Sequence, residues 1–92
     1  MSSSKNLDCK VLRLPVNFDW YNRILSGELT FDYRVQTPYW NKRLENKTYN
    51  FVEFFIRYRK DVKPLKYKFI KIQSHVLRNY DIHLIYFGER VE

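Results

Sequence analysis

The twenty residues from Ile24 to Arg43 constrain the fold more than any other part of this chain, because a helix end, a strand and a second helix start follow one another within them. The helix end belongs to NFDWYNRILSG, an amphipathic segment whose apolar residues share one face: Trp20, Ile24 and Leu25. Asn17 is a typical N-cap, and Gly27 suits the left-handed residue after a helix end. This pattern predicts a short helix from about Asn17 to Gly27.

The pattern then changes to the two-residue period of a strand, from Thr30 to Val35. One side of this predicted strand is apolar and the other polar, because Phe31, Tyr33 and Val35 alternate with Thr30, Asp32 and Arg34. We expect the apolar side to face the core and the polar side to line a ligand site. The alternative role for Arg34 is an ion pair with Asp32 or with Glu53 across the sheet.

A second helix is predicted directly after this strand, because Thr37 is a typical N-cap and Pro38 a typical first helical residue. This helix would carry two aromatic and two cationic side chains: Tyr39, Trp40, Lys42 and Arg43. Trp40 is expected to fill the core of so small a domain, whereas Tyr39 and Arg43 are expected to be exposed. Together, the predicted strand and helix are expected to form one wall of a ligand cleft.

Four further strands are predicted from apolar patterns, over residues 10–16, 49–58, 65–74 and 81–87. In the second of them Val52, Phe54 and Ile56 face one way. The third changes its apolar phase after Phe69, which predicts either a β-bulge or a strand that passes from one side of a barrel to another. The segment HVLRNY is expected to form a turn or a single helical turn, and Gly88 is expected to end the last strand.

Length and composition indicate one small domain over residues 10–92, preceded by a mobile lead-in over residues 1–9. A chain of 92 residues that is 45% hydrophobic and 18% aromatic can enclose one modest core. Cys9 is the one cysteine, so it forms no internal disulfide, and we expect it at a strand start rather than as a nucleophile. Because no apolar run approaches the roughly 20 residues of a membrane helix, we expect a cytoplasmic protein with no membrane partner.

Three segments in order carry a resemblance to a known family: ILSGELTFDYR, PYW with an arginine three positions on, and YNFVEF before a basic loop. They are similar to the small ASCH-domain proteins of the PUA-like superfamily, from about Val11 to the end of the chain. The resemblance implies an α+β fold, with a compact β-barrel, two or three short flanking helices, and a cleft that binds RNA or modified nucleosides. The family members that this chain resembles look like those found in phage and prophage. The chain departs from many relatives at Phe55 to Arg57, where an Asn-Gly pair is common.

Some relatives are acetylcytidine amidohydrolases, and for them the resemblance implies a lysine and a threonine after the glycine. In this chain the lysine position falls on Leu29 and the threonine position on Asp32. A hydroxyl nucleophile then lacks an activating base, so amidohydrolase activity is not expected. Three carboxylates could still act as general acids or bases in a nuclease: Glu28, Asp32 and Glu53.

The middle of the chain carries the basic excess. Residues 41–80 hold eleven lysines and arginines against three acidic residues, within a chain of net charge +7. Cations bind phosphates and flat rings stack on bases, so this composition indicates RNA or another single-stranded nucleic acid as partner. Arg57, Tyr58, Arg59 and Lys60, at a strand end and in the following loop, are the expected contacts there. Alternatively, lysines such as Lys66 and Lys68 only keep strand edges soluble.

The sequence therefore predicts an RNA- or nucleotide-binding domain. The alternatives are an enzyme on nucleic acid, or a phage accessory protein whose basic face binds and inhibits a host protein or ribonucleoprotein. No cofactor is predicted. No metal site is predicted either, because His75 and His83 stand eight positions apart without a cysteine pair.

Overall fold

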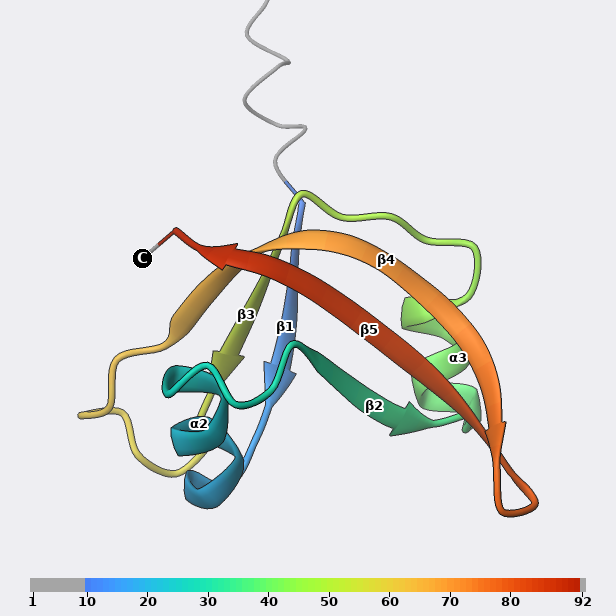
Figure 1. The fold of residues 1–92 in the computed structure, drawn as a ribbon, viewed down its shortest axis with the longest axis horizontal. Coiled ribbons are helices and arrows are strands. Elements are labelled where there is room, and N and C mark those ends of the chain that lie inside the picture. Colours follow the sequence, from blue (N-terminus) through green and yellow to red (C-terminus); the bar gives the residue numbers. More distant parts are fainter. Residues whose placement is uncertain (1–9, 92) are drawn as a thin grey trace, which may run out of the picture.

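The computed structural model describes residues 10–91, so the predictions for the lead-in and for Cys9 lie outside the described residues. The described residues form five strands and two helices, whose arrangement can be followed in Figure 1. In chain order they are β1 (Val11–Pro15), α2 (Phe18–Leu25), β2 (Phe31–Val35), α3 (Pro38–Leu44), β3 (Phe51–Phe55), β4 (Leu65–Leu77) and β5 (Tyr80–Arg90). The predicted α+β class is confirmed.

All five strands belong to one mixed sheet with the order β1-β3-β4-β5-β2. β1 pairs with β3 in parallel, and the other neighbours are antiparallel. β4 and β5 curve into an arch, with α2 near one end and α3 near the other (Figure 1). Within the described residues β1 and β2 remain edges, so backbone pairing does not close the sheet into the barrel that the family resemblance implies.

One face of the sheet, here called the inner face, carries the core. Its buried members come from four strands: Leu12, Leu14, Val52, Phe54, Leu65, Tyr67, Ile85 and Phe87. The helices complete this core with Tyr21 and Ile24 of α2 and Leu44 of α3. Phe54 and Phe87 pack with ring centroids 5.0 Å apart, which adds aromatic contact energy to simple burial. Both helices therefore pack on the inner face.

The two helix starts form as predicted. The Asn17 side chain accepts a hydrogen bond from the Trp20 backbone amide at 2.7 Å, and the Thr37 hydroxyl accepts one from the Trp40 amide at 3.3 Å. Gly27 has the left-handed φ of +86° that the end of α2 requires. The inward face of α2 differs slightly from the prediction, because Leu25 is exposed.

The predicted orientation of β2 is wrong. Its apolar residues point outward and are 36% (Phe31), 44% (Tyr33) and 47% (Val35) exposed, whereas Asp32 is only 3% exposed. In the register Asp32 lies opposite Ile85 and Arg34 opposite His83, both buried residues of the inner face. The two charged groups can face inward because they satisfy each other and find further hydrogen-bond partners there.

The remaining strands match the patterns in part. Val52 and Phe54 face the core as expected, and the ladder between β4 and β5 shifts register on both sides of Phe69, which confirms the predicted bulge. HVLRNY is mostly strand, because β4 continues to Leu77 and only Arg78 and Asn79 form the turn. Both have positive φ, as in the tight turns of β-hairpins. Gly88 does not end β5, which continues to Arg90.

Candidate functional site

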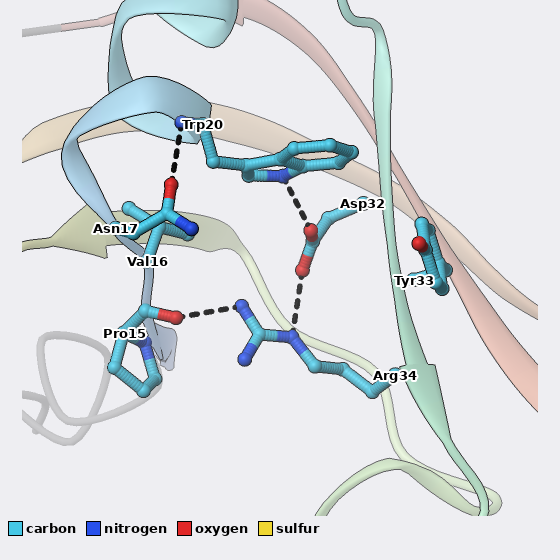
Figure 2. A pocket seen from close by; sticks show the side chains of 7 residues that line it. All are labelled: Pro15, Val16, Asn17, Trp20, Asp32, Tyr33 and Arg34. Carbon is cyan, nitrogen blue, oxygen red and sulfur yellow. Dashed lines mark hydrogen bonds and ion pairs between the residues drawn. The ribbon is translucent and has the colours of Figure 1, made fainter.

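A buried ion pair joins the two free edges of the sheet (Figure 2). Arg34 Nε donates to Asp32 Oδ2 at 2.8 Å, and Arg34 Nη2 donates to the carbonyl oxygen of Pro15, at the end of β1, at 2.9 Å. Asp32 Oδ1 accepts from the indole nitrogen of Trp20 at 2.7 Å. The guanidinium also lies 5.0 Å from the centre of the Trp40 ring. We call Asp32, Arg34 and Trp20 the edge bridge, because they link β2 to β1 and α2 by side chains rather than by backbone pairing.

The side chains of the edge bridge are largely buried. The side chains of Arg34 and Asp32 are 16% and 4% exposed. Burial raises the pKa of Asp32 above its ordinary value, although the charge and hydrogen bond of Arg34 and the Trp20 bond act in the opposite direction. Both carboxylate oxygens of Asp32 accept a hydrogen bond, so Asp32 holds the edge bridge together. Arg34 then forms part of the surface above Asp32.

Three hollows that share lining residues lie over this bridge and the adjoining loops. The first, about 260 Å³, is lined by the edge bridge, Tyr33 and the segment from Pro15 to Asn17. The second, about 470 Å³, shares Pro15 to Asn17 and adds Phe18 and residues 56–59. The third, about 320 Å³, shares Ile56, Arg57 and Arg59 with the second. Each hollow thus borders the next, and the three are called the edge groove below.

The far end of the edge groove is basic. Four cationic side chains line the third hollow: Arg13, Arg57, Arg59 and Lys60. Arg13 is paired with Glu53 at 2.7 Å, and Arg59 with Asp61 at 3.0 Å. Within residues 10–91, Arg57 and Lys60 have no ion-pair partner. Tyr58, 89% exposed, lies between Arg57 and Arg59 in the sequence and lines the second hollow.

The predicted residues on α3 lie apart from this groove. Tyr39, Lys42 and Arg43 are exposed, but they line none of its three hollows. Arg43 lies 3.9 Å from the centre of the Tyr39 ring and covers it. Trp40 packs against the core, as expected, and backs Arg34. Thr30 is exposed just before β2 and also lies outside the lining of the groove.

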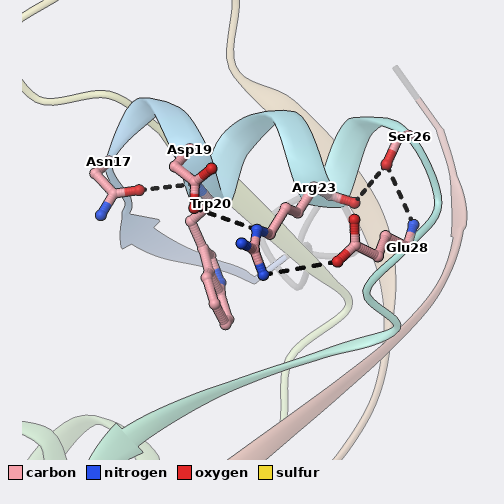
Figure 3. A network of polar contacts seen from close by, with 6 residues as sticks. All are labelled: Asn17, Asp19, Trp20, Arg23, Ser26 and Glu28. Carbon is pink, nitrogen blue, oxygen red and sulfur yellow. Dashed lines mark hydrogen bonds and ion pairs between the residues drawn. The ribbon is translucent and has the colours of Figure 1, made fainter.

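The three candidate catalytic carboxylates do not converge. Glu28 pairs with Arg23 at 3.6 Å at the end of α2, within a surface network that also includes Asp19 (Figure 3). Asp32 belongs to the edge bridge, and Glu53 pairs with Arg13 on the outer face of β3. No two of them share a hollow of the groove. The structure therefore brings together no carboxylate pair for acid-base catalysis among these three.

Several groove residues were missed by sequence reasoning. Arg13 and Phe18 were given no role, Trp20 was assigned only to the apolar face of its helix, and Tyr33 was assigned to the core. Only the folded register shows that these residues meet, because they come from separate elements. No local sequence signal distinguishes them from ordinary surface or core residues.

Two further findings concern the described residues, 10–91. Their histidines and carboxylates include no group of three or more that could hold a metal ion. No helix among them combines the length and apolar character that crossing a membrane requires.

In comparisons with known proteins, no protein-family model, no curated protein and no solved structure matches this chain.

Proposed function

We propose that the protein binds single-stranded RNA in the edge groove. The observation that carries the proposal is the exposed ring of Tyr58, which lines the hollow of about 470 Å³ and is flanked in the sequence by two arginines that line both this hollow and the basic one. An exposed aromatic ring beside cations is what single-strand binders use, since the ring stacks on any base and the cations neutralise phosphates.

The basic hollow is the phosphate end of the proposed interface. Arg57 and Lys60 carry charges that no partner within residues 10–91 compensates. Asp61 binds Arg59 through two hydrogen bonds of 3.0 Å and so competes with a phosphate for that guanidinium. Arg57 and Lys60 are therefore the main phosphate ligands, with Arg59 in a lesser role.

The hollow over the edge bridge is the base end. Its volume of about 260 Å³ lies just below the roughly 300–1,000 Å³ typical of small-molecule pockets, so it suits one base rather than a larger ligand. Arg34 and the Asn17 amide offer donors, and Tyr33 and Trp20 offer apolar surface. The edge bridge fixes this end before RNA arrives, which reduces the entropy lost on binding.

Salt dependence of binding tests the proposal. Oligouridine RNA should bind the wild-type protein with an affinity that falls steeply as salt rises, because cations on phosphates release counterions. Replacing Arg57 and Lys60 by glutamine should reduce the slope of log affinity against log salt by about 1.4, that is, roughly 0.7 for each single-strand phosphate that is no longer neutralised. The matched control removes the same charge from the α3 side with Lys42→Gln and Lys47→Gln and should retain the wild-type slope. An affinity independent of salt would overturn the proposal.

The family assignment is part of the same proposal. We assign the chain to the ASCH-domain family of the PUA-like superfamily as a small member of the phage type, with a barrel completed by the edge bridge instead of backbone pairing. The residues that carry the resemblance support this, because ILSGELTFDYR supplies Asp32 and Arg34, and PYW supplies the Trp40 ring behind Arg34. A cleft beside these residues is also where the family would bind its ligand.

A further inference from the structure

The outer face of the sheet carries aromatic side chains next to the edge groove. Residues opposite each other in a register share a face, so Phe31 lies beside Tyr86, and Tyr86 in turn lies beside Lys71. The rings of Phe31 and Tyr86 have centroids 6.0 Å apart. The Lys71 ammonium lies 5.2 Å from the centre of the Tyr86 ring. These three residues, together with Tyr33, are called the outer strip.

The outer strip is open to solvent. Phe31 is 36% exposed and Tyr33 44% exposed, while Tyr86 is partly buried and Lys71 is exposed. Both helices pack on the inner face, and α2 meets the strip at Tyr33 through the ring of Trp20. A solvated strand face is usually polar, so the exposed rings of β2 beside the partly buried ring of Tyr86 on β5 call for an explanation.

Tyr33 joins the outer strip to the edge groove. It lines the hollow over the edge bridge, and its ring meets the Trp20 ring edge-on with centroids 6.0 Å apart. In the register Tyr33 sits on the same face as Phe31, two residues along β2. A strand of nucleic acid that leaves the groove at Tyr33 would therefore meet Phe31, Tyr86 and Lys71 next.

The charge of the outer face indicates which kind of partner could bind there. Three outward aromatic rings of the sheet lie under cations: Phe55 under Arg13 at 4.3 Å, Phe51 under Lys66 at 5.0 Å and Tyr86 under Lys71. An apolar protein surface would have to desolvate these cations, whereas phosphates would pair with them while bases stack on the rings. The face therefore fits a single-stranded nucleic acid better than an apolar partner.

We infer that the outer strip is a second contact surface for the same RNA, on which bases leaving the edge groove stack on Tyr33, Phe31 and Tyr86 and a phosphate pairs with Lys71. This inference rests on the proposed function, since the groove provides the first contact. It adds a length requirement, because only an RNA longer than the groove can cross β2 and reach Lys71.

The test compares short and long oligouridine, of about 4 and about 12 nucleotides, within the range that single-strand binding sites span. The wild-type protein should bind the long RNA more tightly by at least tenfold. The double variant Phe31→Ala and Tyr86→Ala should lose about tenfold or more in affinity for the long RNA and almost none for the short one. Tyr80→Ala is the matched control, because it removes an exposed ring from β5 at the hairpin turn, and it should leave both affinities unchanged.

The possible outcomes separate the two proposals. The inference about the outer strip is wrong if the long RNA binds no more tightly than the short one, or if the double variant loses equal affinity for both lengths. Either result leaves the proposal that the groove binds RNA in place. If neither the short nor the long RNA binds, both proposals are wrong. A wild-type dimer in sedimentation that the double variant makes monomeric would assign the strip to a second copy of the chain and would also overturn the inference. Thermal melts of the variants confirm that each retains the fold.

Discussion

The two ends of the edge groove hold their arginines in opposite ways. Arg34 is 16% exposed and has a carboxylate, a backbone carbonyl and the Trp40 ring as partners. Arg57, at the other end, is exposed and has no ion-pair partner within residues 10–91. An arginine therefore holds the fold together at one end, whereas at the other end its charge is available to the proposed ligand. Substitutions at the Arg34 end should therefore change stability first, and substitutions at the Arg57 end should change affinity alone.

The largest effect is expected from Asp32→Ala. Removing the carboxylate leaves a buried guanidinium and a buried indole nitrogen without their partner, and breaking a buried ion pair in this way costs about 3–5 kcal/mol. Urea denaturation would measure the change. Glu28→Ala is the control, because it breaks an exposed ion pair and should cost about 0–1 kcal/mol. Similar costs for the two variants would mean that the edge bridge does not hold the edges together.

Arg57→Ala should show the opposite behaviour. It removes an exposed cation, so the free energy of unfolding should change by less than about 0.5 kcal/mol, while RNA affinity at low salt should fall several-fold. Fluorescence anisotropy with labelled oligouridine, alongside the melt of the same sample, gives both values. A variant that loses stability and keeps its affinity would reverse the roles assigned to the two ends.

A pH dependence should come from His83, which lies on the inner face opposite Arg34. Its Nε2 contacts the Asn41 side-chain oxygen of α3 at 2.8 Å, and its Nδ1 is buried without a partner among the described residues. Burial lowers the pKa of His83 below its ordinary 6.5, against the opposing charge of Glu45. Because the folded state disfavours the proton, the stability that the neutral ring provides is present above pH 6.5 and is lost as pH falls through the folded pKa.

Urea midpoints measured between about pH 7.5 and pH 5 would show this loss. His83→Gln should flatten the dependence, whereas His75→Gln, at an exposed site on β4, should retain it. A profile that is equally steep in both variants would assign the pH dependence to other groups.

A modest loss of stability is expected from Phe31→Ala. Its ring is 36% exposed on the outer face, so truncation should cost less than the roughly 3–5 kcal/mol of a buried phenylalanine, on the order of 1 kcal/mol. Arg34→Ala, in contrast, should destabilise the fold strongly. Thermal melts of the two variants decide which face of β2 is buried, and an unfolded Phe31→Ala beside a stable Arg34→Ala would contradict the structure.

The misassigned face of β2 illustrates what the sequence can predict. Alternation identifies which residues share a face, and it did so correctly for Asp32 and Arg34, but it does not tell which face is buried. The usual assumption buries the apolar side, and it failed because Trp20 and the Pro15 carbonyl supply partners for the charges. Those partners come from α2 and the end of β1, so the local sequence pattern of β2 does not predict them.

Other features were predictable because their causes are local. The Asn17 and Thr37 caps, the left-handed Gly27 and the change of phase near Phe69 each depend on a few neighbouring residues. The hairpin turn was predicted over too long a segment, since Arg78 and Asn79 alone form it with positive φ and without a glycine. The basic segment from Arg57 to Lys60 was recognised from its charge, but its neighbour Arg13 depends on the pairing of β1 with β3.

Crosslinking locates the RNA most directly. Oligouridine irradiated with ultraviolet light in complex with the wild-type protein, followed by mass spectrometry, reports which side chains lie against the bases. Crosslinks at Tyr58 and Tyr33, which line the edge groove, are the predicted result. Crosslinks confined to Tyr39 on α3 or to Tyr80 at the hairpin turn would contradict the proposal that the edge groove binds RNA.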